Sequence, residues 1–430
     1  MERYLKTVAR GQRLAGAAMV LLLLATRLAA QTQPVPALPP EPAPESEATL
    51  GQTQPPPPAG AAAPARAPRS WEYELGAGGG WNSNVDFVDP NGPSGSWVMP
   101  RGGLAHLFWT PHGQLRATAA GRWTGYPNQT ELSRYYADFG LEGRYRSSPH
   151  TDWRANADYW LGYSDSSRLL LAQGVLLPLV RSRSLTGSLG VTHALGRTSL
   201  RVDGRFYRTA FDSPGLIDGK SARGTIGLER PLSSRSAVAI EYSLEDVLSD
   251  QAGRSHLTHF ASMQWTRILS PRSALLLEGG ASYTPNPARA GLEQPQSFYG
   301  GAAFSRQVKR SSLTLFIRRE VTPAFGYGVS RVALRGGLDA TLPIGRLWKL
   351  RALAIVVRPE GQGPVGSIHD ATDAFAALVR PLGRHVDLSG EVRYRRRGAA
   401  SGIPMIEAFE AGLFVTLATP SWRAIVPWPR

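Results

Sequence analysis

The chain has 430 residues, no Cys and a formal net charge of +15. Without Cys it can hold no disulfide, no thiolate nucleophile, no Cys-ligated zinc and no lipid attached to a cysteine. Its basic residues are nearly all Arg, among many Ala, Gly and Pro, so GC-rich codons explain part of the charge and the Arg content alone assigns no function.

Residues 1–30 are predicted to be a secretory signal peptide. Basic residues between Arg3 and Arg13 precede the apolar run Met19–Thr26, and a plausible cleavage site follows Ala30. The apolar run is too short for a permanent membrane anchor, and no later stretch has the ~18 consecutive apolar residues that a transmembrane helix needs. The exported chain is therefore expected to be periplasmic, secreted or an outer-membrane barrel.

Residues 31–70 are predicted to be a disordered, Pro-rich periplasmic segment. Twelve prolines lie between Pro34 and Pro68, and such a composition favours extended polyproline II over a packed core. The segment is either a spacer or an arm that contacts peptidoglycan or a partner. It is too short for the folded plug of energy-coupled outer-membrane receptors.

From residue 71 to 418 the chain predicts a succession of β-strands. In the stretch 134–146, Tyr135, Phe139 and Leu141 share one face, whereas Arg134 and Glu142 share the other. The same alternation returns in stretch after stretch, and aromatic residues gather near the strand ends. Alternation of apolar and polar side chains along strands, with aromatic girdles, is typical of a transmembrane β-barrel.

Short, similar turns, such as 194–199 and 343–348, alternate with longer Gly/Pro/Asp-rich loops, such as 284–296 and 359–370. Short periplasmic turns and long outer loops are typical of a membrane barrel. The sequence therefore predicts an all-β fold, a single transmembrane up-and-down antiparallel barrel of 18 strands, with 16 as the fallback. Counting 165–183 as a strand would give an odd number, so we interpret it as an outer loop that could fold into the pore.

The last predicted strand, 406–417, carries the pattern Glu410-x-Gly412-x-x-Val415-x-Leu417. It resembles the C-terminal insertion signal of bacterial outer-membrane β-barrels, with Leu417 where that family prefers an aromatic residue. The resemblance implies an integral outer-membrane protein that contacts outer-membrane lipid and the outer-membrane assembly machinery. Residues 419–430 would then be a C-terminal tail. The alternative is an edge strand of a soluble β-sandwich.

The sequence holds no recognisable catalytic motif. Eight His are scattered, His256 and His259 would point to opposite faces of a strand, and no zinc-protease, nucleophile-elbow, P-loop or EF-hand motif occurs. We expect no enzyme, no metal and no cofactor. Nucleic acid is not an expected partner either, because no concentrated basic patch with stacking aromatics stands out.

The predicted inner faces carry many arginines interspersed with acids. They either brace the wall through cross-strand pairs or line a lumen that favours anionic solutes. The predicted pore-lining residues are Arg116, Arg122, Arg144, Arg154, Arg201, Arg205, Arg223, Arg318, Arg331, Arg335, Arg351, Arg393 and Arg395.

The layout of signal peptide, Pro-rich arm, long barrel and no plug resembles the integral outer-membrane barrels of polysaccharide-export systems. That resemblance covers residues 71–417 and implies export of a secreted polysaccharide across the outer membrane, with a periplasmic polysaccharide-export protein as a partner. The alternatives are a general or anion-favouring diffusion porin and a closed structural or adhesive barrel.

Overall fold

The computed structural model describes residues 71–87, 89–164, 179–213, 215–249, 254–308, 311–360, 370–398 and 404–419. The predicted signal peptide and Pro-rich segment, and all but the first residue of the predicted tail, lie outside this part of the chain. So do residues 165–178 of the ambiguous stretch 165–183.

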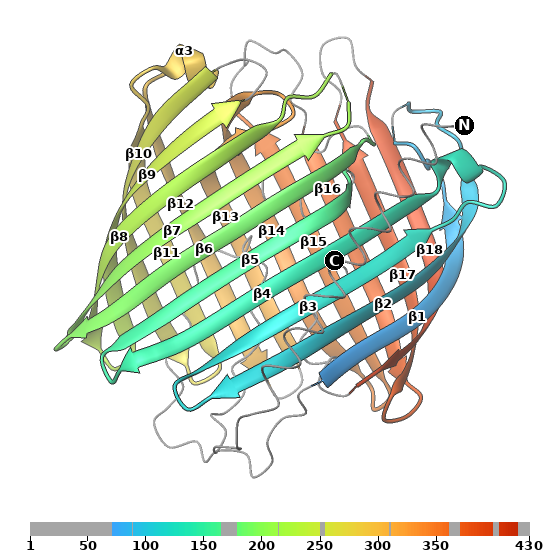
Figure 1. Cartoon of the computed structure of the whole chain (residues 1–430), viewed down its shortest axis with the longest axis horizontal. Coiled ribbons are helices and arrows are strands. Elements are labelled where there is room, and N and C mark those ends of the chain that lie inside the picture. Colours follow the sequence, from blue (N-terminus) through green and yellow to red (C-terminus); the bar gives the residue numbers. More distant parts are fainter. Residues whose placement is uncertain are drawn as a thin grey trace.

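The described residues form one antiparallel sheet of 18 strands that closes into a barrel (Figure 1). The strands are β1 (Trp71–Asn82), β2 (Gly95–Thr110), β3 (Gly113–Thr124), β4 (Arg134–Ser148), β5 (Thr151–Tyr163), β6 (Arg181–Leu195), β7 (Thr198–Phe211), β8 (Gly219–Ser233), β9 (Ser236–Ser249), β10 (Arg254–Ser270), β11 (Ser273–Tyr283), β12 (Gln296–Val308), β13 (Ser311–Ala324), β14 (Val329–Ile344), β15 (Trp348–Pro359), β16 (Ala371–Pro381), β17 (Val386–Arg397) and β18 (Ile406–Ala418). This confirms the predicted fold class and strand number.

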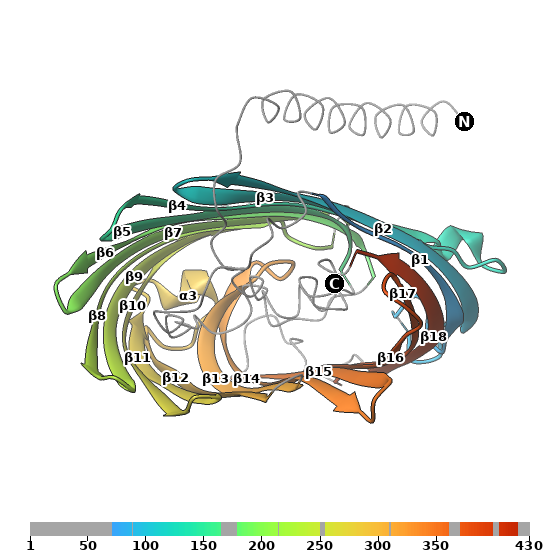
Figure 2. The same cartoon turned by 90° about the horizontal axis from the view of Figure 1, so that it is seen from below.

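Closure comes from the first strand, which pairs with both β2 and β18. Each strand from β2 to β17 pairs with its two neighbours in sequence, so the ring has no open edge. Figure 2 shows the ring flattened into an oval. A 3₁₀ turn, η1 (Thr130–Leu132), and a short helix, α3 (Pro287–Ala290), lie in the connections. No helix among the described residues is long and apolar enough to cross a membrane.

The longest connections follow β1, β3, β5, β7, β11, β15 and β17 and therefore lie at one end of the barrel, which we call the long-loop end. Two predicted loops are shorter than expected. The predicted loop 322–328 shrinks to 325–328 because β13 continues to Ala324, and the predicted loop 209–220 shrinks to 212–218. Residues 181–183, predicted to be loop, begin β6.

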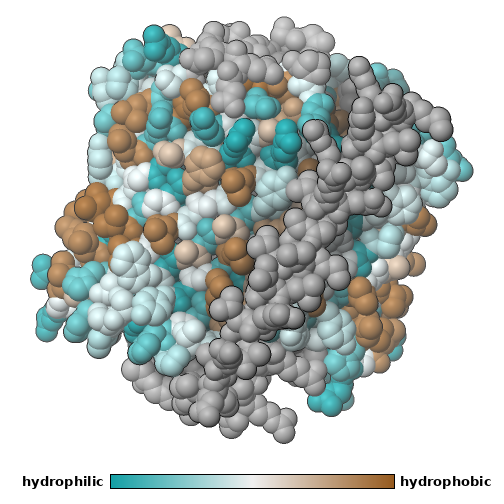
Figure 3. All heavy atoms as spheres, in the orientation of Figure 1, coloured by the Kyte–Doolittle hydropathy of each residue, from teal (hydrophilic) through white to brown (hydrophobic). Residues whose placement is uncertain are grey.

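The outer wall is apolar, as the alternation predicts. Tyr135, Phe139 and Leu141 on β4 are exposed, while Arg134 and Asp138 on the same strand are buried inside. Figure 3 shows apolar side chains spread over the described wall that faces the viewer. The inside of the barrel therefore holds the polar side chains, and the search for a functional site begins there.

Candidate functional site

The strand register assigns each residue to one side of the wall. Arg122 on β3 pairs with Tyr136 on β4, and Asp138 pairs with Ala120, so these residues share the inner face. Following the register around the ring places every predicted pore-lining arginine on this inner face. Whether these arginines line a conducting pore remains a prediction.

Ion pairs run across the inner face in the middle of the barrel. Arg101 on β2 contacts Glu74 on β1 at 3.1 Å and Glu391 on β17 at 3.8 Å, which ties together strands on both sides of the closing seam. Its guanidinium also lies 4.6 Å above the ring of Phe414 on β18. That ring lies against Gly78 of β1, where a Cβ would come within 2.2 Å of it. A glycine is therefore required under Phe414.

A second group of ion pairs lies on the far side of the ring. Arg318 on β13 contacts Glu278 on β11 at 3.0 Å and Glu320 at 3.5 Å, and Glu320 contacts Arg335 on β14 at 2.8 Å. All four side chains are largely buried. Together with the group around Arg101, they form what we call the braced belt. A buried charge without its partner is costly, so the belt links neighbouring strands.

At the long-loop end the tip of the β13–β14 hairpin leaves the wall and bends into the barrel. Phe325 at the tip is 1% exposed and stacks on Tyr207 of β7, with ring centroids 5.6 Å apart and planes at 10°. Gly326 exchanges two backbone hydrogen bonds with Ile217 in the β7–β8 loop. In Figure 2 the orange end of this hairpin curves into the interior of the ring. We call residues 323–330 the mouth hairpin.

A second contact fixes the mouth hairpin to the wall. Ser330 would face outward by strict alternation, because its neighbours Val329 and Arg331 take the inner positions. It is instead 2% exposed, and its Oγ lies 2.8 Å from Nε2 of His256 on β10. Strands β11, β12 and β13 separate β10 from β14 in the sheet. The contact therefore requires the start of β14 to lean across the interior.

Glycines allow this bend. Gly326 has φ of 91° and Gly328 has φ of 69°, a region that residues with a Cβ rarely adopt. A Cβ at Gly328 would also lie 2.8 Å from the side chain of Ile217. Tyr327, between the two glycines, packs against the cluster around Phe325. Burial raises the pKa of Tyr327 against the opposing effect of Arg397 and Arg331, so its hydroxyl stays protonated at neutral pH.

The β1–β2 loop also turns inward at this end. Phe87 is fully buried, has φ of 52°, and packs against inner residues of β14 to β18. The guanidinium of Arg395 lies 5.2 Å from the Phe87 ring centroid, and that of Arg397 lies 5.8 Å away. Across the barrel, Arg134 donates a hydrogen bond to the carbonyl of Val85. Arginines and aromatic rings therefore surround the narrowed mouth.

The predicted pore-lining arginines fall into different environments. Arg116 pairs with Glu72, Arg201 with Asp203, and Arg393 with Asp373 at 2.8 Å. Arg154 and Arg205 are exposed. The others contact the braced belt, inner aromatic rings or neighbouring polar groups, or stand near the mouth: Arg122, Arg144, Arg223, Arg318, Arg331, Arg335, Arg351 and Arg395.

Two important arginines were not among the predicted pore-lining residues. Arg101 lies in the stretch Met-Pro-Arg-Gly-Gly, whose proline and glycines hide the alternation that would assign it to the inner face. Arg397 ends β17 in a run of arginines, where alternation alone could have found it. The inward positions of Phe87 and Phe325 carry no signal in the local sequence, because both lie in connections.

The predicted insertion signal occupies β18 beside the closing strand β1. Val415 and Leu417 point outward and are exposed, whereas Gly412 lies on the inner face beneath the ring of Trp97. Its role in assembly stays a prediction. Within the described ranges, no group of three or more His, Asp or Glu could hold a metal ion.

Comparison with known families gives one match. Residues 73–225 match the model of the family described as putative beta-barrel porin 2, a span that covers less than half of the chain. None of the curated proteins matches this chain.

Solved structures of outer-membrane proteins are similar in outline. The chain is similar to OpdO of Pseudomonas aeruginosa, with a TM-score of 0.43 at 12% identity over 81% of this chain and 97% of that one. The outer membrane protein opdK of the same organism gives 0.42 at 11% identity over 81% and 98%. The siderophore receptor PirA of Pseudomonas aeruginosa gives 0.38 at 9% identity over 82% and 81%.

Proposed function

We propose that this chain, a porin-like β-barrel of the outer membrane, is a channel with a gated mouth that favours anionic solutes. The observation that carries the proposal is the mouth hairpin, which crosses the interior and narrows a barrel of 18 strands. A barrel of that size leaves an aqueous channel unless it is filled. Among the described residues, the hairpin and the inward-turned β1–β2 loop thus narrow the path.

The charges near the mouth support a preference for anions. Arg331, Arg395 and Arg397 lie on the inner face at the long-loop end, on strands β14 and β17. Fixed charges in a narrow aqueous path raise the local concentration of the oppositely charged ion. In the middle of the barrel, by contrast, the arginines of the braced belt face carboxylates, so the belt adds little net charge.

Export of a polysaccharide is the second candidate, and the aromatic lining favours it. Tyr136, Trp160, Tyr207 and Phe325 form one cluster inside the barrel near the mouth. These rings are covered while Phe325 stacks on Tyr207, so they would meet a sugar chain once the mouth hairpin moves aside. An acidic polysaccharide would satisfy both the aromatic and the arginine side chains. The periplasmic export partner of this candidate remains a proposal too.

Single-channel recording in planar bilayers tests the first candidate. We expect the unmodified barrel to switch between a low and a higher conductance, with anions more permeant than cations. Arg331→Glu should lower the anion/cation permeability ratio, while Arg358→Glu on the outer face of β15 should leave the ratio unchanged. A barrel without conductance under any condition would reject the channel and favour the closed structural barrel.

Deletion of the chain in its host separates the two candidates. Loss of surface polysaccharide with unchanged uptake of small solutes would favour export. Slower uptake of small anions with normal surface polysaccharide would favour the diffusion channel. Neither outcome requires catalysis by the barrel, and we propose no enzymatic role.

A further inference from the structure

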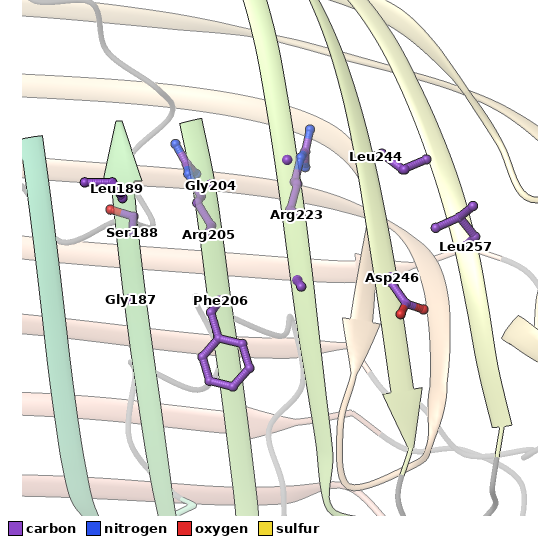
Figure 4. Close-up of a pocket in the computed structure, with 12 residues that line it drawn as sticks. Gly187, Ser188, Leu189, Gly204, Arg205, Phe206, Arg223, Leu244, Asp246 and Leu257 are labelled. Atoms are coloured by element: carbon purple, nitrogen blue, oxygen red, sulfur yellow. The ribbon is translucent and has the colours of Figure 1, made fainter. Parts of the chain in front are cut away.

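The outer wall carries an apolar groove over strands β6 to β10, away from the interior described so far. Its volume is about 550 Å³ (Figure 4). Phe206, Leu244 and Leu257 line it and are exposed, which shows that it opens on the side of the wall that faces lipid. We call it the outer-wall groove.

Small residues on neighbouring strands form the floor of the groove. Gly204 on β7 pairs directly with Gly224 on β8, and Phe206 pairs with Ala222. A Cβ at Gly224 would meet nothing within 4 Å, and one at Gly204 would meet only a backbone oxygen at 4.0 Å. The missing side chains therefore leave a trough in the wall, with larger apolar side chains on either side.

Three basic residues stand next to the groove on the same outer face: Arg183, Arg208 and Lys220, which we call the basic rim. Arg208 lies two residues beyond Phe206 and pairs directly with Lys220, so both are one pleat, about 7 Å, from the groove. Arg183 lies one pleat further on β6, beside Ala210. All three are exposed.

Two other arginines on the outer wall at this end, unlike the basic rim, contact carboxylates. Arg319 contacts Glu360 at 2.7 Å, and Arg396 contacts Glu407 at 4.0 Å. Among the residues that the structure describes, no carboxylate comes within 4.0 Å of a basic-rim nitrogen. Three carboxylates lie one pleat from the rim in register. Asp246 borders the groove opposite Ala222. Asp212 contacts Arg181 at 3.7 Å, and Asp218 accepts a hydrogen bond from the backbone N–H of Phe211.

The position of the rim relative to the membrane follows from the connections. The rim lies toward the long-loop end, which in outer-membrane barrels faces the outside. Cations there lie at the level of lipid headgroups, and the groove extends from them toward the apolar middle of the wall. Exposed basic side chains at that level are stabilised when anionic lipid headgroups lie beside them.

We propose that the outer-wall groove and basic rim bind a phosphorylated, acyl-chain-bearing lipid of the outer leaflet. Its phosphate would contact Arg208, Lys220 and Arg183, and one acyl chain would occupy the trough above Gly204 and Gly224. Charge complementarity assigns the headgroup, and the apolar lining of the trough assigns the chain. The site is separate from the channel mouth and does not depend on what the channel passes.

Native mass spectrometry of the full chain in mild detergent tests the site, with diphosphoryl lipid A as the probe. We expect Arg183→Gln/Arg208→Gln/Lys220→Gln to weaken binding at least tenfold. Gly224→Leu should also weaken lipid binding, because its side chain would project into the trough without clashing with the wall. Arg358→Gln/Arg396→Gln, at the same end on other strands, should bind like the unmodified protein. Heat-resistant migration in detergent establishes that each variant has folded.

Further binding measurements distinguish the lipid from other occupants of the groove. Inorganic phosphate at millimolar concentration should not displace the lipid, and the fully dephosphorylated lipid should bind the unmodified protein at least tenfold more weakly. Unchanged binding by the triple variant, or equal binding of phosphorylated and dephosphorylated lipid, would overturn the proposal. So would a dimer whose contact, mapped by cross-linking from Gly224→Cys, covers the groove.

Discussion

The braced belt and the mouth hairpin lie inside the same barrel but are held by different forces. In the belt, buried Arg101 and Arg318 each contact two carboxylates on the wall. The hairpin is held by a ring stack within a buried apolar cluster, a backbone bridge and the His256–Ser330 hydrogen bond and, among the described residues, by no ion pair. Breaking a buried ion pair leaves a costly charge, whereas a hydrogen bond contributes only about 1 kcal/mol. The belt is therefore suited to hold the wall, and the hairpin is suited to move.

The largest effect is expected from Arg101→Ala. It leaves Glu74 and Glu391 buried without their shared cation, so the free energy of unfolding should fall by about 3–5 kcal/mol. Urea unfolding in lipid vesicles, followed by tryptophan fluorescence, measures this loss. Arg154→Ala, at an exposed position on the inner face, is the matched control and should change stability little. Equal losses in the two variants would show that the belt does not brace the wall.

Phe325→Ala should act mainly on the channel. It removes the stack on Tyr207, so the hairpin can swing away while the wall stays intact. We expect a higher unitary conductance and a stability loss of at most about 3 kcal/mol, the lower end for a buried Phe→Ala change. Phe298→Ala is the control, because this ring is 80% exposed on the outer wall. Unchanged conductance with a large loss of stability would show that the hairpin stabilises the wall and does not gate the channel.

Ser330→Ala sharpens the comparison by removing a single hydrogen bond. Losing the contact with His256 should weaken the closed position by about 1 kcal/mol, which corresponds to about a fivefold longer open time relative to closed time. Single-channel dwell times measure the change. Ser255→Ala, beside His256 but exposed on the outer face, should leave dwell times as they are. A change in the free energy of unfolding without a change in dwell times would show that Ser330 stabilises the wall, as the braced belt does.

The smallest effect is expected from Arg335→Gln and Arg393→Gln on ion selectivity. Each guanidinium already lies 2.8 Å from a carboxylate, on Glu320 and Asp373 respectively, so each pair contributes little net field to the lumen. The anion/cation permeability ratio should fall only slightly, and less than for Arg331→Glu at the mouth. Reversal potentials in a salt gradient give this ratio. A fall as large as that of Arg331→Glu would mean that arginines paired with carboxylates on the wall control selectivity as well.

Sequence alternation predicted the wall because each strand has two different environments. On β4, the outward Tyr135 and Phe139 and the inward Arg134 and Asp138 occupy the sides that period 2 assigns. The number of strands followed from the regular turns and the even count that closure requires. The facing of side chains and the number of strands depend on residues close together in sequence, so both can be predicted from the sequence.

The mouth could not be predicted in the same way. Ser330 lies at an outward position by alternation but is buried against His256, because the hairpin leaves the plane of the wall. Phe325 meets Tyr207 across the barrel, and neither residue signals the other along the chain. The contact of Arg101 with Glu391 across the closing seam likewise joins residues far apart in sequence. Pairing across the interior depends on the closed ring, and period 2 says nothing about it.

The pairing of β1 with β18 determines when this molecule can be completed. Glu74 lies opposite Ala418, so the seam joins residues from the two ends of the barrel sequence. A ring of this kind cannot be sealed while its final strand is still being synthesised or exported, however early the other hairpins form. Until then β1 and β18 are both open edges, which readily pair with other chains. The unfinished protein therefore needs protection in transit, and the arrival of β18 decides when that protection can end.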